Sequence, residues 1–288
     1  MIDERGHFFM SNFELMGDHE HYVLPAKSVK SDVRFDVYDY EQIPSTNSIA
    51  MLLAMKETKP NICITTRWQT DGRGRMGKHF YSPKGTGLYF TLIYRNDTNI
   101  YDALMITPAV ACAVASVLEE ESGKEMGIKW VNDIYCNGKK VCGILTESSI
   151  DFENVKLNHA IIGVGINLTK PKLGFVDEIE DIAGVVFDKP LSPTKKKKLL
   201  EKLLLSMDKY LKMLSTCEFM DEYRRRSILI GKEVIVQNGR EKFEAKVLGI
   251  DNRAGLVVEA SGDCKVLQSG EVSIKMPKAT KKTKSTKA

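Results

Sequence analysis

The segment from Gly72 to Lys78 reads Gly-Arg-Gly-Arg-Met-Gly-Lys and follows a strand-like stretch at 62–68. Glycines let a backbone approach a ligand closely, and the cations between them attract anions, so this segment suits a phosphate or a carboxylate. Its spacing comes near the P-loop signature, but His79 stands where that signature needs Ser or Thr to hold magnesium. A flexible turn and an RGG-like nucleic-acid contact are the alternatives at this point.

Cysteine and histidine chemistry finds no support in the sequence. The six cysteines are scattered, with no C-x-x-C pair and no histidine at metal-ligand spacing from a cysteine pair. This pattern argues against structural zinc and against a disulfide framework. The five histidines fit no Ser-His-Asp or Cys-His arrangement, because three precede residue 32 and the others are His79, in the loop, and His159, at a strand start.

Composition indicates a globular protein with little excess charge on its body. The 288 residues are 43% hydrophobic and 28% charged, enough for one substantial core and a smaller second domain. Six lysines follow Ile274, and without them the net charge of +4 becomes −2, which disfavours a nucleic-acid-binding body. No apolar run has the length of a membrane span and no signal-peptide layout occurs, so we expect a cytoplasmic protein that does not contact membranes.

The elements that must position the glycine segment have the pattern of an α/β (α+β) domain with a mixed, largely antiparallel sheet and flanking helices. Strands are predicted at 33–40, 62–68, 88–94, 127–130, 133–136, 141–147 and 159–167. Helices are predicted after Ser45-Thr46-Asn47, over 103–118 with Pro108 in the first turn, and within 192–226. Five further strands, at 233–237, 243–250, 256–260, 263–267 and 272–275, predict a small C-terminal barrel.

With these elements in order, the chain resembles the biotin protein ligases from about Val33 to Lys275. The motifs that carry the resemblance are Ser45-Thr46-Asn47, the segment 72–78 followed by Ser82-Pro83, Lys129-Trp130-Val131-Asn132-Asp133, Lys140-Val141-Cys142-Gly143-Ile144-Leu145 and Gly163-Val164-Gly165-Ile166-Asn167. The C-terminal barrel resembles the SH3-like domain of that family. The implied domains are a partly disordered leader at 1–32, a catalytic domain at 33–228 that binds biotin and ATP, an SH3-like domain at 229–276 and a disordered lysine-rich tail at 277–288.

The resemblance implies an ATP-dependent ligase that makes biotinyl-5′-AMP and transfers biotin to a lysine of a biotin carboxyl carrier protein or domain, as in acetyl-CoA carboxylase. Biotin and ATP would be the substrates, with Mg²⁺ accompanying ATP. The leader is too short for the helix-turn-helix domain of the ligase-repressors, so we expect no repressor function and no DNA partner. Either a monomer or a homodimer is compatible with the family.

The resemblance also assigns residues. The catalytic set would be Lys140, Arg75 and Lys129. The biotin-binding set would be Ser45, Thr46, Asn47, Gln69, Gly72, Arg73, Gly74, Arg75, Lys140, Gly143 and Gly163. The nucleotide-binding set would be Arg75, Met76, Gly77, Lys78, Lys129, Asn132, Asp133 and Asn167, with Asp133 also a ligand of Mg²⁺. Arg73, Arg75 and Lys78 would close over the reacting groups as the loop orders on biotin.

Each assignment has a plain structural alternative. Lys140 could cap the predicted Asn137-Gly138 hairpin, and Ser45 or Thr46 could serve only as a helix N-cap. The Gly-x-Gly within the predicted strand 159–167 could reflect close packing. Lipoate ligases and octanoyltransferases share the architecture but lack the Gly-Arg-Gly-Arg-x-Gly loop. A nucleic-acid-binding module and a ligase-like protein without activity are the other readings.

Overall fold

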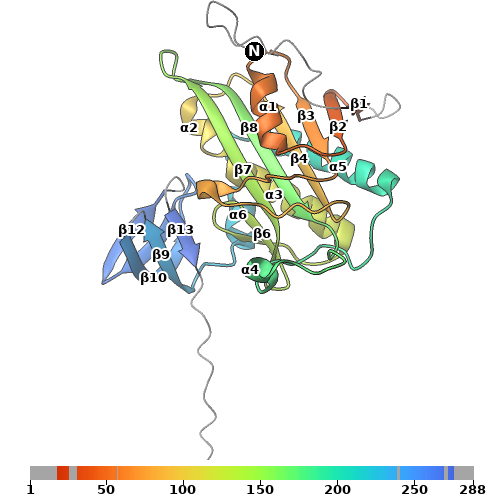
Figure 1. Cartoon of the computed structure of the whole chain (residues 1–288). Coiled ribbons are helices and arrows are strands. Elements are labelled where there is room, and N and C mark those ends of the chain that lie inside the picture. The colour runs from red at the N-terminus through yellow and green to blue at the C-terminus, as the bar shows by residue number, and fades with distance from the viewer. Residues whose placement is uncertain (1–17, 26–30, 57, 239–240, 269–271, 276–288) are drawn as a thin grey trace, which may run out of the picture.

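The computed structural model describes residues 18–25, 31–56, 58–238, 241–268 and 272–275 (Figure 1). Its larger part is an eight-stranded sheet in the order β1-β2-β3-β4-β8-β7-β6-β5. The strands are β1 (His19–Leu24), β2 (Phe35–Tyr40), β3 (Ile62–Thr66), β4 (Gly87–Tyr94), β5 (Gly127–Lys129), β6 (Asp133–Cys136), β7 (Lys139–Asp151) and β8 (Lys156–Asn167). β2 and β3 pair in parallel and all other neighbours pair antiparallel, which confirms the predicted mixed, largely antiparallel sheet.

Helices cover the two faces of this sheet unequally. The helices are α1 (Thr46–Ala54), α2 (Ile100–Ala103), α3 (Ile106–Ser122), α4 (Asp177–Glu180), α5 (Pro193–Leu211) and α6 (Met220–Arg226). The main core joins α3 and α5 to even-numbered β8 residues such as Ile162 and Val164, while a smaller core joins α1 to Ile161 of the same strand. Successive side chains of a strand point to opposite faces, so the odd positions of β8 face the α1 side. On that side β8 carries Gly163 and Gly165 and leaves space above the sheet.

The structure differs from the sequence-based predictions in three regions. β1 lies in the stretch predicted as leader, where it pairs with β2 and buries Leu24. β7 and β8 are longer than predicted because their hairpin continues to Asp151 and Lys156. The helical region 192–226 is two helices, with Cys217 in the left-handed backbone region between them at φ 55°.

A second sheet follows α6 in the order β12-β11-β10-β9-β13 and is antiparallel throughout (Figure 1). Its strands are β9 (Glu233–Asn238), β10 (Glu241–Ile250), β11 (Leu256–Ala260), β12 (Asp263–Leu267) and β13 (Val272–Lys275), five strands as predicted. The arrangement is consistent with an SH3-like domain. Trp130 Nε1 donates to the Ala254 carbonyl over 2.8 Å, which ties this sheet to the end of β5.

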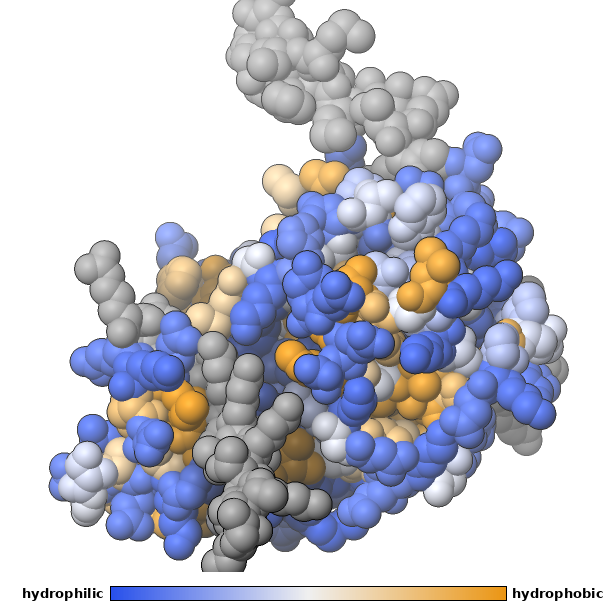
Figure 2. All heavy atoms as spheres, turned by 60° about the horizontal axis from the view of Figure 1, so that its bottom comes forward, coloured by the Kyte–Doolittle hydropathy of each residue, from blue (hydrophilic) through white to orange (hydrophobic). Residues whose placement is uncertain are grey.

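Apolar side chains are largely internal. In the view of Figure 2, hydrophilic residues cover most of the described surface and apolar residues appear as separate patches. No helix within the described ranges is long and apolar enough to cross a membrane.

Candidate active site

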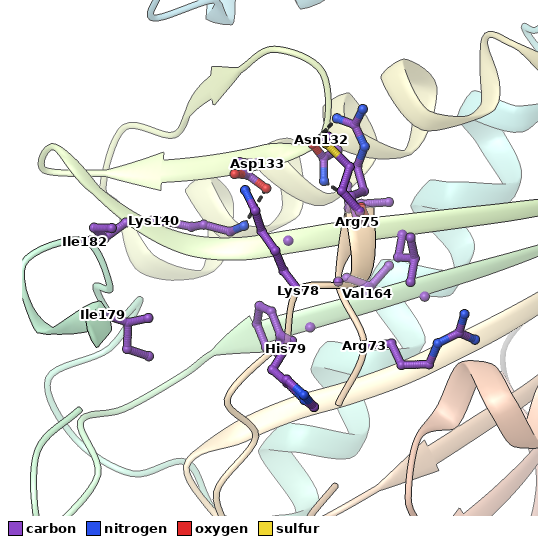
Figure 3. A pocket seen from close by; sticks show the side chains of 18 of the residues that line it. Arg73, Arg75, Lys78, His79, Asn132, Asp133, Lys140, Val164, Ile179 and Ile182 are labelled. Atoms are coloured by element: carbon purple, nitrogen blue, oxygen red, sulfur yellow. Dashed lines mark hydrogen bonds and ion pairs between the residues drawn. The ribbon is translucent and has the colours of Figure 1, made fainter. Parts of the chain in front are cut away.

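A cavity of about 660 Å³ lies over the α1 side of β7 and β8 (Figure 3). Its walls come from the start of α1, the segment 72–80, the β5–β6 turn and the residues around α4. A volume of this size is within the range of small-molecule sites. Gly143, Gly163 and Gly165 form the floor of the cavity. Larger residues at these positions would place side chains in the cavity.

The structure brings most of the predicted site residues to this cavity. Those that line it are Ser45, Thr46, Asn47, Gln69, Arg73, Gly74, Arg75, Met76, Lys78, Lys129, Asn132, Asp133, Lys140, Gly143 and Gly163. Gly72, Gly77 and Asn167 do not line it. Gly72 is packed inside the loop, where a Cβ atom would lie 2.3 Å from the Phe80 carbonyl oxygen. Asn167 is the last residue of β8, and its carbonyl accepts from Val186 N over 3.0 Å.

The glycine segment folds as a short hairpin. Phe80 N donates to Gly72 O over 2.8 Å, and Gly74 N donates to Lys78 O over 2.7 Å. The chain reverses at Met76 and Gly77, whose φ values of 56° and 70° lie in the left-handed region. Glycine adopts that region without a steric cost, which explains why the tip carries one. The hairpin thereby returns Phe80 to the cavity wall.

An uncharged polar network occupies the α1 end of the cavity. Gln69 Oε1 accepts from Thr46 N over 2.8 Å and from Thr46 Oγ1 over 3.1 Å. Gln69 Nε2 donates to Ser82 Oγ over 2.8 Å, which leaves its second N–H for another acceptor. Ser45, one of the two residues for which capping was the alternative role, occupies the N-cap position of α1, but its side chain makes no capping hydrogen bond. The Ser45 hydroxyl, which lines the cavity, is therefore not used by the helix end.

Asn47 joins α1 to the floor strands. Its Nδ2 donates to Glu147 Oε2 over 2.9 Å and to Leu145 O over 3.3 Å, and its Oδ1 accepts from Thr91 Oγ1 over 2.7 Å. A Cβ atom on Gly163 would lie 1.9 Å from Asn47 Oδ1. The glycine therefore makes room for the amide. Sequence reasoning missed Thr91 and Glu147, since polar residues within strands give no signal of a distant partner.

Cations gather at the other end around one carboxylate. Lys140 Nζ lies 2.5 Å from Asp133 Oδ1, and in Figure 3 the Lys78 side chain also extends toward Asp133. The backbone of Lys140 pairs with the segment after α4, through Lys140 N to Ile182 O and Gly184 N to Lys140 O, each 2.8 Å. The Asn137-Gly138 turn forms as predicted, with both φ values positive. Because the Lys140 side chain points into the cavity, hairpin capping does not explain it.

Arg75 is held deeper in the same end. Its Nη1 donates to Asn132 Oδ1 over 3.1 Å, and Asn132 Nδ2 donates to Ile144 O over 2.8 Å. Burial lowers the pKa of Arg75 from its ordinary value, and the nearby Asp133 carboxylate opposes that shift. An arginine keeps its proton through such a shift, so the guanidinium stays a cation. The Nζ atom of Lys129 lies 5.9 Å from the centre of the Tyr135 ring.

Arg73 is separate from this cationic group. Figure 3 shows it at the far end of the cavity from Asp133 and Lys140. Its guanidinium forms two bonds with Glu147, of 2.8 and 3.2 Å. In this structure Arg73 therefore lies apart from Arg75 and Lys78. The expectation that all three close over the reacting groups as the loop orders on biotin stays a prediction.

Several wall residues were not among the predicted site residues. Ile179, Asp181 and Ile182 border the cavity on the side of Lys140, and Trp130 and Tyr135 contribute rings. Ile179 and Ile182 belong to or follow α4, a four-residue helix among acidic residues. Isolated isoleucines among acidic residues give no sequence signal that they line a binding cavity.

Comparison with known proteins agrees with this geometry. Residues 40–167 match the model of the biotin/lipoate A/B protein ligase family. The bifunctional ligase/repressor BirA of Bacillus subtilis (strain 168) is 29% identical over 262 residues, covering 87% of this chain and 80% of that protein. The biotin--[acetyl-CoA-carboxylase] ligase of Paracoccus denitrificans is 27% identical over 234 residues, which cover 79% of this chain and 96% of that protein.

Among solved structures, the biotin protein ligase from Aquifex aeolicus in complex with biotin and ATP has a TM-score of 0.68 at 25% identity, covering 84% of this chain and 99% of that one. The match extends over both the sheet domain and the chain that follows it, and it agrees with the motif order and with the relatives. Residues 40–167 therefore form a domain of the biotin/lipoate A/B protein ligase family, and the whole proteins that the chain resembles are biotin protein ligases.

Proposed function

We propose that this enzyme joins biotin to ATP as biotinyl-5′-AMP and then transfers the biotinyl group to a lysine of an acceptor protein. One observation carries the proposal: one end of the cavity offers uncharged hydrogen-bonding groups, with Arg73 there neutralised by Glu147, the other end is cationic, and a glycine floor lies between them. Biotin has the same layout, with a neutral ureido ring at one end and a carboxylate at the other.

The α1 end complements a ureido group in number and type of hydrogen bonds. The remaining N–H of Gln69 Nε2 can donate to the ureido carbonyl, and the Ser45 hydroxyl can donate or accept. Asn47 Oδ1, which already accepts from Thr91, keeps a second lone pair for a ureido N–H. Burying this group unpaired would cost about 1–3 kcal/mol for each polar atom, so the match favours biotin over an acid with an apolar ring.

The cationic end suits the adenylation step. The biotin carboxylate oxygen attacks the α-phosphorus of ATP, and the bond from that phosphorus to pyrophosphate breaks. Two anions must meet, so Lys140, Arg75 and Lys78 would neutralise the carboxylate and phosphate oxygens as they approach. Lys140 is the residue best able to bridge them, because its ammonium group extends into the cavity from β7.

The triphosphate of ATP would lie near Lys129 and Asn132, and the adenine base would lie against the apolar side chains near α4. Ile179 and Ile182 line the cavity beyond Lys140, as Figure 3 shows. Contacts with these side chains would remove apolar surface of the base from water. In this arrangement the triphosphate lies over the β5–β6 turn, where the cations are.

Mg²⁺ fits this site only as an ion brought by ATP. The described part of the chain contains no group of three or more His, Cys, Asp or Glu side chains able to hold a metal. Mg²⁺ commonly uses one or two carboxylates together with phosphate oxygens and waters. Asp133 Oδ1 is buried and pairs with Lys140 Nζ, with no other polar partner for it among the described residues, so the Asp133 carboxylate could be one such ligand. When bound, the ion would neutralise phosphate charge.

In the transfer step, the acceptor lysine amine attacks the acyl carbon of biotinyl-5′-AMP, the amide bond forms and AMP leaves. Positioning and exclusion of water would account for this step without a covalent enzyme intermediate. Asp133 is the candidate to accept the proton of the amine. The name of the Paracoccus relative favours a biotin carboxyl carrier domain of acetyl-CoA carboxylase as the acceptor.

The test is exchange of labelled pyrophosphate into ATP with biotin, lipoate or octanoate as the acid. Exchange that depends on biotin alone supports the proposal, and transfer to a purified carrier domain then tests the second step. Exchange with lipoate or octanoate but not biotin would move the chain to the other branch of the family. If no acid supports exchange, the ligase proposal is wrong, and nucleic-acid binding is the next property to measure.

A further inference from the structure

Glu147 lies next to the cavity without being one of its lining residues. It is on β7, two residues beyond Leu145 and four beyond Gly143, so it shares the strand face on which they line the site. Its side chain is 26% exposed. A partly buried carboxylate needs partners, and Glu147 has two of them in different segments.

The first partner is Arg73, at the base of the glycine hairpin. Glu147 Oε1 accepts from Arg73 Nη2 over 2.8 Å, and Oε2 accepts from Nη1 over 3.2 Å. Two parallel bonds between a guanidinium and a carboxylate fix orientation as well as distance. Arg73 also forms a backbone bridge with His79, so fixing Arg73 fixes both arms of the hairpin.

The second partner is Asn47, in the uncharged end of the cavity. Glu147 Oε2 accepts from Asn47 Nδ2 over 2.9 Å. This bond, with that to Leu145 O, uses both N–H groups of the amide and keeps Oδ1 as the atom beside Gly163. One carboxylate thus controls which atom Asn47 offers a ligand and where the hairpin stands.

We propose that Glu147 is a positioning residue for acid binding, which couples the orientation of the Asn47 amide to the position of the glycine hairpin through Arg73. The proposal rests on the proposed function, because it names the acid-binding end of the same site. Glu147 does not line the cavity, so in the proposed arrangement it would touch neither the reacting carboxylate nor the phosphate. Its removal therefore affects how the acid is held and retained more than the rate of the chemical step.

The kinetic test uses Glu147→Gln and Glu147→Ala in pyrophosphate exchange. A hydrogen bond to a charged group is worth about 1.5–3 kcal/mol, so Glu147→Ala should raise KM for biotin by about 10- to 100-fold. KM for ATP and kcat should change by less than about threefold, since no interaction made only in the transition state is lost. Glu147→Gln keeps an oxygen for Asn47 and should lie between Glu147→Ala and the unchanged protein. Glu153→Gln, an exposed site in the turn after β7, is the matched control.

The second readout is independent of activity. Trypsin cleaves after arginine and lysine, so the rate of cleavage within 73–78 reports how firmly the hairpin is held. Glu147→Gln should be cut several-fold faster than the unchanged protein without any ligand. The reversed pair Glu147→Lys with Arg73→Glu should restore resistance at Arg75 and Lys78, while KM for biotin stays high because a lysine cannot accept from Asn47.

The two readouts separate the proposals. If the unchanged protein shows no biotin-dependent exchange, the proposed function fails, yet the trypsin comparison still tests the Glu147–Arg73 contact. The positioning role is overturned if Glu147→Gln, with unaltered thermal unfolding, has the same KM for biotin and the same cleavage rate as the unchanged protein. A fall in kcat without a change in either quantity would also overturn it.

Discussion

A Cβ atom on Gly163 would lie 1.9 Å from Oδ1 of Asn47, so the floor strand and the first turn of α1 approach too closely for any side chain between them. The same strand has a second contact of this kind, since a Cβ atom on Gly165 would lie 2.5 Å from the Phe80 ring. Two predicted site segments, the start of α1 and the end of the glycine hairpin, therefore rest on the Gly-Val-Gly motif.

Gly163→Ala should displace the Asn47 amide and weaken biotin binding. The added methyl group can be accommodated only if Asn47 moves, and overpacking of this kind costs about 1–3 kcal/mol of stability. We expect KM for biotin in pyrophosphate exchange to rise about tenfold or more, which corresponds to the loss of roughly one hydrogen bond. Gly249→Ala is the control, because nothing lies within 4 Å of a Cβ atom there. Equal biotin KM values in both variants would refute this account of the glycine.

Lys140→Ala should abolish most of the adenylation rate. Removing one preorganised charge from a site of developing negative charge typically lowers kcat by about 10²–10³-fold. The uncharged contacts to the ureido end remain in this variant, so KM for biotin should change much less than kcat. Steady-state exchange at saturating biotin and ATP measures the effect, with Lys156→Ala, an exposed lysine paired to Asp97, as the control. A variant that keeps more than about a tenth of the rate would exclude Lys140 as the bridging residue.

The sequence was sufficient to predict most elements in order, since alternation marks strands such as β2 and an apolar stripe marks α5, but β1, α2 and α4 were not predicted. The motif residues converge on one cavity because the motifs follow strand ends and turns that the sheet brings together. Other features depended on contacts between distant segments. Glu147 acts across 74 positions on Arg73, and Ile179 gains its place from the backbone pairing of Lys140 with the segment after α4. Neither relation leaves a periodic signal in the chain.

Trp130→Phe should loosen the C-terminal sheet. The indole N–H donates to the buried carbonyl of Ala254, and phenylalanine would leave that oxygen without this donor. The expected cost is about 1–3 kcal/mol in the free energy of unfolding. Urea unfolding measures it, with Trp68→Phe as the control because that ring is 38% exposed. If both substitutions cost the same, the Trp130 hydrogen bond contributes nothing specific.

His159 should make stability depend on pH. Burial, and then the charge of nearby Arg95, lower the pKa of His159 below its ordinary value of 6.5. The unfolded chain therefore binds a proton at a higher pH than the folded protein does. Above about pH 7.5 both states hold His159 neutral and the residue contributes no slope; as the pH falls through about 6.5, protonation favours the unfolded state.

The expected outcome is that the unchanged protein loses more stability than His159→Gln between about pH 7.5 and about pH 5. Other titrating groups are common to both proteins, so the difference between their unfolding free energies isolates His159. Urea unfolding at several pH values in that window, at constant ionic strength, provides the comparison. If the free energies of unfolding of the two proteins change in parallel with pH, burial and Arg95 do not disfavour the charged His159 imidazole.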